Sequence, residues 1–169
     1  MRREEEPGGR SVNTAFIDEP NFYRLGFASQ IMVWAMRKRL HHLAHGASEA
    51  NVLEAFRVAG LDDIHAALMS IVNLLLCRPS HRVQLHNVAC AGLSPHEISL
   101  LNALAYRQRG DFVESERHMR QLFCVTAARL LQPAVVAIVN GLDAGGLCLT
   151  AVADDDTVAP SARLSVALH

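Results

Sequence analysis

Two cysteines and two histidines lie close together in the middle of the chain, in the pattern C-x3-H-x4-H-x3-C. They are Cys77, His81, His86 and Cys90. Thiolate and imidazole are the ligand types that zinc prefers, and four of them can close a tetrahedral structural site. Common zinc signatures place paired ligands two to four residues apart, often as C-x2-C, and this segment does not. Our first interpretation is therefore a connector without metal, and a zinc site is the alternative.

A second pair of candidate ligands lies further toward the N-terminus. His41 and His45 are four residues apart, so they share one helical face, as a metal-binding pair would. The metalloprotease pattern H-E-x-x-H is not met, because His42 stands where that pattern has its glutamate base. The plainer interpretation is a solvated helix end.

Basic residues directly precede these histidines. Arg37, Lys38 and Arg39, together with His41, could contact the phosphates of a nucleic acid. Cations near the C-terminus of a helix also complement its partial negative charge, which explains the run without a ligand. We do not expect nucleic acid as the partner, because binders usually have a broader patch and a basic overall balance.

No recognisable motif predicts catalysis. The chain has no G-x-S-x-G elbow, and its glycines stand at the ends of predicted helices rather than in a phosphate-binding loop. Cys124 and Cys148 have no C-x-x-C partner, so redox exchange has no support. The sequence favours a protein that is not an enzyme.

Apolar residues are more abundant than a core of this size requires. Half of the residues are hydrophobic, and the mean hydropathy is +0.14. In the first predicted helix Phe27, Ile31 and Trp34 lie partly off the main apolar stripe. Surplus apolar surface usually enters a subunit interface, so we expect these residues to serve a homo-oligomer, most simply a homodimer.

Length, charge and cysteine content set the class of protein. A chain of 169 residues suits one domain that folds without disulfides. The N-terminus lacks the apolar segment of a secretory signal, so the four cysteines predict free thiols in a reducing cytoplasm. The net charge of −1 creates no field that attracts nucleic acid, and the apolar runs are shorter than the ~20 residues of a membrane span. Arginine outnumbers lysine strongly, which hints at a bacterial source.

Periodicity and capping residues predict five or six helices. A stripe from Phe22 to Leu43 predicts the first helix, which ends at Gly46. Val52, Phe56 and Ala59 share a face of a short second helix, and a third runs from Asp62 or Asp63 to Pro79. Beyond it, the capping box Ser94-Pro95-x-Glu97 begins a fourth helix. A fifth passes from Asp111 through Cys124 to Leu130, and a sixth begins near Pro133.

The predicted fold is therefore an all-α bundle with a short extended connector at about 82–88. We expect a mobile N-terminal segment at 1–17, a single helical domain at 18–149, and a weakly structured tail at 150–169. No second globular domain is visible.

Two short segments resemble known helical motifs. ALAYRQRGDFVESERHMRQLF resembles one tetratricopeptide hairpin, with Ser115 where that repeat usually has alanine; about three copies are needed for a continuous core, and a single copy indicates an ordinary hairpin. LSPHEISLLNALA looks like the opening of a LuxR-type helix-turn-helix, but the next helix begins late and with acidic residues.

These observations predict a regulatory or adaptor subunit that acts through protein contacts with its own copies or with an unidentified protein. A zinc-stabilised domain and a nucleic-acid-binding regulator are the alternatives.

Overall fold

The chain folds into helices joined by loops. A computed structural model describes residues 20–46, 48–77 and 83–152. This part of the chain contains seven α-helices, one short 3-10 helix and no β-strand, so the all-α prediction is confirmed. The elements are η1 Phe22–Arg24, α1 Phe27–His45, α2 Ala50–Val58, α3 Asp62–Leu76, α4 Pro95–Gln108, α5 Phe112–Leu122, α6 Val125–Leu130 and α7 Gln132–Ala144.

The first long helix begins later than the apolar stripe predicts. The stripe starts at Phe22, but the side chain of Asn21 caps η1, and the backbone at Leu25 is extended, so α1 starts only at Phe27. The end of α1 is as predicted. Gly46 has a φ of 66°, a left-handed conformation that glycine adopts without a steric penalty.

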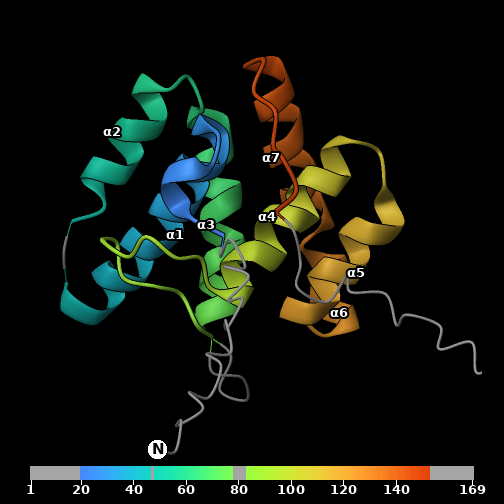
Figure 1. The fold of residues 1–169 in the computed structure, drawn as a ribbon, viewed down its shortest axis with the longest axis horizontal. Helices are drawn as coiled ribbons and strands as arrows, with labels where there is room; N and C mark the ends of the chain where they lie inside the picture. The colour runs from blue at the N-terminus through green and yellow to red at the C-terminus, as the bar shows by residue number, and fades with distance from the viewer. Residues whose placement is uncertain (1–19, 47, 78–82, 153–169) are drawn as a thin grey trace, which may run out of the picture.

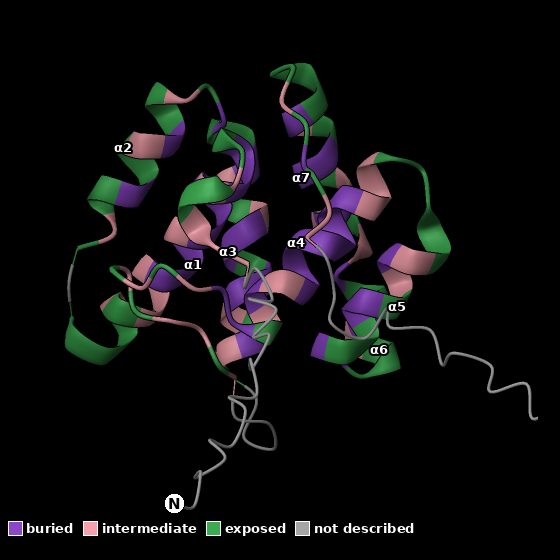
Figure 2. Ribbon diagram, in the orientation of Figure 1, coloured by how far each residue is buried: buried purple, intermediate pink, exposed green. Residues whose placement is uncertain are grey.

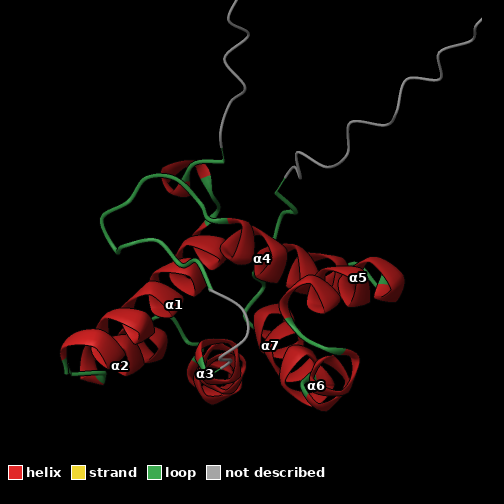
Figure 3. Cartoon of the chain, turned by 90° about the horizontal axis from the view of Figure 1, so that it is seen from below, coloured by secondary structure: helices red, strands yellow, loops and turns green. Residues whose placement is uncertain are grey.

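Helix α3 packs along α7 in the middle of the bundle (Figure 3). Almost every turn of α3 contributes a buried side chain, from Ile64, Leu68, Met69, Ile71, Val72 and Leu75. The two helices approach closely at Gly141 of α7, because a methyl group placed there would lie 2.1 Å from Cγ2 of Ile64. This glycine is therefore required for packing rather than for its backbone conformation.

Helix α4 begins as the sequence predicts, and it forms a hairpin with α5. The Glu97 N–H donates to the Ser94 hydroxyl (3.2 Å), and the Ser94 N–H donates to the Glu97 carboxylate (2.9 Å), which completes the capping box. In the hairpin, the Ser115 hydroxyl donates to the Ala103 carbonyl (2.8 Å). Ser115 thus occupies a close contact between the helices, as a small residue can.

The predicted fifth helix is wrong in one respect, because it divides into α5 and α6. Phe123 has extended backbone angles (φ −136°, ψ 152°) that no helix can contain, and its side chain is buried in the core. Cys124, expected within the helix, is exposed and stands at the N-cap of α6. The break lets Phe123 enter the core while the chain turns back toward α7.

The helices form two layers around a common core (Figures 1 and 3). In Figure 3, α4 lies between α1 and α5, and α3 and α7 lie beneath them. Figure 2 shows that the buried residues concentrate on the facing sides of α1, α3, α4 and α7. Helix α2 stands at the edge, packed mainly on α3.

Two non-helical segments complete the structure. Residues 83–87, within the predicted connector, have no regular secondary structure, and Asn21 forms an isolated β-bridge with Gly92. Residues 147–152 form a C-terminal strap along α4. The Asn102 side chain accepts from the Val152 N–H (2.7 Å) and donates to the Val152 carbonyl (3.0 Å). The predicted segment 1–17 and residues 153–169 of the predicted tail lie outside the described residues.

Within the described ranges, no helix combines the length and apolar character needed to cross a bilayer.

Candidate functional site

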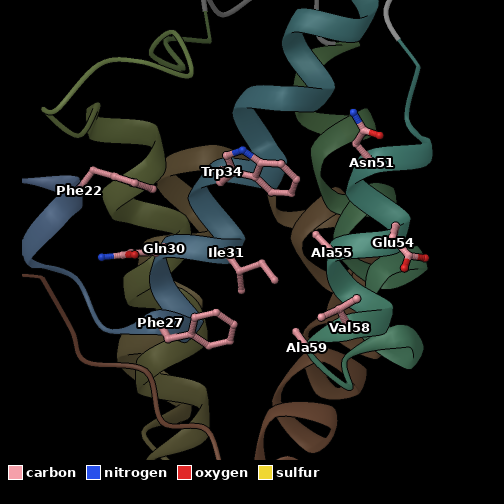
Figure 4. A pocket seen from close by; sticks show the side chains of 10 residues that line it. All are labelled: Phe22, Phe27, Gln30, Ile31, Trp34, Asn51, Glu54, Ala55, Val58 and Ala59. Carbon is pink, nitrogen blue, oxygen red and sulfur yellow. The ribbon is translucent and has the colours of Figure 1, made fainter.

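An apolar groove of about 660 Å³ runs between α1 and α2 (Figure 4). One wall comes from α1 and carries Phe27, Ile31 and Trp34, the three residues that the sequence predicts as an interface. Ile31 forms the floor, with 9% of its surface exposed, whereas Phe27 on the rim is 57% exposed. The structure thus brings these three side chains together on one open surface, and whether they contact another chain stays a prediction.

The opposite wall comes from α2, and the sequence gave no reason to single it out. Ala55, Val58 and Ala59 line this side, and Val58 is 75% exposed. Val52 and Phe56 are buried, as expected of the inner face of α2, but Val58 lies off that face. A valine outside the periodic stripe was the available signal. Small side chains at 55 and 59 keep the groove open.

The polar residues that line the groove have hydrogen-bond partners elsewhere. The Gln30 amide donates to the Leu25 carbonyl (3.0 Å), and in Figure 4 it points away from α2. Glu54 pairs with Arg57 of the same helix (2.6 Å). This hydrogen bond lowers the pKa of the Glu54 carboxyl, so the pair is ionised but mutually neutralised at neutral pH. The groove therefore presents an apolar surface with little net charge.

Arg37, predicted as a phosphate contact, is instead the most deeply buried polar anchor of the connector. Only 1% of its surface is exposed. Its guanidinium binds both carboxylate oxygens of Glu97 (2.8 and 2.9 Å) and donates to the carbonyls of Cys90 and Gly92 (2.6 Å each). The ring of Phe22 lies 5.3 Å away. Arg37 is thus unavailable to an external phosphate, and the expected basic patch loses this residue.

The other residues of that run lie nearer the surface. Lys38 lies over the ring of Trp34 (5.8 Å), and Arg39 pairs with Glu49 and donates to Asn73. His41 is exposed, and its ring lies 4.6 Å from that of His45. The run therefore does not form one continuous cationic surface.

The candidate zinc ligands are only partly brought together. The Cys90 sulfur lies 3.4 Å from Nδ1 of His86, and this nitrogen lies 3.0 Å from the Gly92 carbonyl. Cys77 is exposed at the end of α3, and His81 lies outside the described residues. In the described part of the chain, no group of three or more His, Cys, Asp or Glu side chains is placed to hold a metal.

Comparison with protein-family models, with curated proteins and with solved structures finds no match to this chain.

Proposed function

We propose that this protein is a non-catalytic helical subunit that self-associates through the groove between α1 and α2. The observation that carries the proposal is the groove itself, where exposed apolar side chains of two helices face each other across open space. Exposed apolar surface of this extent is typical of protein contacts. The associated form would act as a regulatory or adaptor subunit.

A second copy of the chain is the occupant that the charges favour. The Glu54–Arg57 pair leaves the groove without a net charge to be matched, and the chain as a whole carries only −1. Two copies therefore repel each other little, and a near-zero net charge promotes association. A strongly charged partner peptide would find no complementary charge there.

The shape of the site also suits a two-fold dimer. A two-fold interface places the same patch of both subunits against itself, so each patch must offer both a projection and a recess. Here Phe27 and Val58 project from the two rims, and Ile31 with Ala55 forms the recess between them. The rim side chains of one copy can enter the recess of the other.

Trp34 gives a direct test, because it is the only tryptophan of the chain and it lines the groove. Burial by a second copy should shift its fluorescence to shorter wavelength as the protein is concentrated through the micromolar range. Val58→Asp should remove this concentration dependence without changing the helical content. An emission spectrum that stays constant with concentration would contradict the proposal.

The free cysteines support a reducing, cytoplasmic setting. All four are free thiols, and Cys77, Cys124 and Cys148 are exposed, which oxidising compartments rarely leave unpaired.

A zinc-stabilised connector is the second candidate, and one distance favours it. Two ligands of a tetrahedral zinc ion, sulfur at about 2.3 Å and nitrogen at about 2.0 Å, lie roughly 3.5 Å from each other. The Cys90 sulfur and Nδ1 of His86 are 3.4 Å apart, in keeping with shared coordination. Metal analysis of the purified protein tests this candidate independently of the groove.

A further inference from the structure

A second, smaller pocket of about 340 Å³ lies where α1 begins. Its walls come from the chain before α1, including Arg24 and Gly26, from Ser29 in the first turn of α1, and from Thr150–Val152 of the strap. The pocket is therefore built from segments far apart in the sequence. It is separate from the groove between α1 and α2, although both adjoin the first turn of α1.

The start of α1 is short of hydrogen-bond acceptors in the described part of the chain. The first N–H groups of any helix have no partner within it, and they attract negative charge. At α1 the N-cap residue is Gly26, no described side chain caps it, and its first turn contains no acidic residue. By contrast, Ser94 caps α4 and Asp111 caps α5.

Ser29 is the polar side chain that marks the pocket as a binding site. It is 2% exposed and lines the pocket, and no hydrogen bond joins its hydroxyl to another described side chain or carbonyl. Burying a hydroxyl without a partner costs free energy. A ligand that accepts from this hydroxyl and from the first N–H groups of α1 would satisfy both.

The strap brings acidic residues to this pocket. Asn102 holds both backbone polar groups of Val152, so the chain at the pocket wall is fixed to α4. The sequence continues with Ala153 and then three aspartates, Asp154 to Asp156. Two residues of extended chain span at most about 7 Å, so the first of these carboxylates is within reach of the pocket that Val152 lines.

We infer that this pocket is a carboxylate-binding site for the acidic run Asp154–Asp156 of the same chain, which caps the N-terminus of α1. A carboxylate there accepts from the first N–H groups of α1 and from Ser29, and Arg24 adds a positive charge. The contact joins the C-terminal segment to the turn that carries Phe27. It stands whether or not the groove binds a second copy.

Hydrogen exchange of the full chain, followed by NMR, tests the inference. Replacing Asp154, Asp155 and Asp156 together by Asn should speed exchange at the amides of Phe27, Ala28 and Ser29 roughly fivefold, as for loss of a helix cap. The first-turn amides of α4 should not change, because the Ser94–Glu97 capping box is intact. Ser29→Ala should give a smaller change at the same amides.

The matched control removes the other acidic residues close to the pocket in sequence. Asp18 and Glu19 directly precede Pro20, which also lines the pocket. The variant Asp18→Asn with Glu19→Gln should leave exchange in the first turn of α1 as in the natural chain. The inference is overturned if this control reproduces the effect, or if the triple Asn variant exchanges like the natural chain.

Discussion

The guanidinium of Arg37 and the carboxylate of Glu97 form a buried, two-pronged ion pair that joins α1 to the start of α4. Both side chains are fully enclosed, and each also binds the connector. Arg37 donates to the carbonyls of Cys90 and Gly92, while Glu97 accepts from the N–H groups of His86 and Ser94. Since every polar atom of the pair has a partner, burial of the two charges is compensated.

Removing one member of this pair should be costly. Arg37→Met leaves the Glu97 carboxylate buried without its counter-ion, and we expect a loss of about 3–5 kcal/mol in the free energy of unfolding. Urea denaturation measures it. Arg37→Met combined with Glu97→Gln should lose less than Arg37→Met alone, because no unpaired charge remains buried. A cost below about 1 kcal/mol for Arg37→Met would show that the pair is not closed in solution.

Gly141→Ala should destabilise the contact between α3 and α7. The new methyl group would overlap Cγ2 of Ile64, and overpacking of this kind costs about 1–3 kcal/mol. Thermal unfolding measures the change, and Ile64→Ala in the same chain should make Gly141→Ala less harmful. Gly145→Ala is the control, because its methyl group would meet only ordinary contacts of 3.5 Å or more. Equal effects at positions 141 and 145 would argue against the close approach.

Asn102→Leu should release the C-terminal strap. The substitution removes two hydrogen bonds to Val152 from a buried site, for an expected loss of roughly 1–3 kcal/mol. The amide of Val152 should then exchange faster, whereas the amide of Leu149, which donates to Gln108, should change less. Unchanged exchange at Val152 would mean that the strap is held by other contacts.

If the second candidate function is correct, the purified protein contains about one equivalent of zinc, and a chelator lowers its thermal stability. His86→Ala with Cys90→Ser should abolish both effects. Cys124→Ser with Cys148→Ser should leave them unchanged, because these thiols lie in other parts of the chain. A metal-free protein that is indifferent to chelator would rule out the zinc site.

Local signals in the sequence were sufficient for most helix boundaries. The capping box at Ser94 and the break after Gly46 depend only on neighbouring residues, so they could be predicted. The break at Phe123 could not, because the core that draws this side chain inward is formed by distant segments. Arg37 was misplaced for a similar reason: its burial depends on Glu97 and two carbonyls of the connector, which no helical pattern reveals.

The groove shows the same division. Phe27, Ile31 and Trp34 were recognisable as surplus apolar residues on one helix. The facing wall at Ala55 and Val58 depends on how α2 leans on α3, and this angle is a property of the packed core.

Sedimentation velocity of the full chain tests the central claim most directly, with two variants of α2 compared side by side. Val58 lines the groove, whereas Leu53, on the same helix, is outside it, and both are exposed (75% and 51%). The account predicts a dimer for the natural chain and for Leu53→Asp, and a dissociation constant raised at least about tenfold for Val58→Asp. A natural chain that is monomeric throughout the micromolar range, or two variants that behave alike, would contradict it.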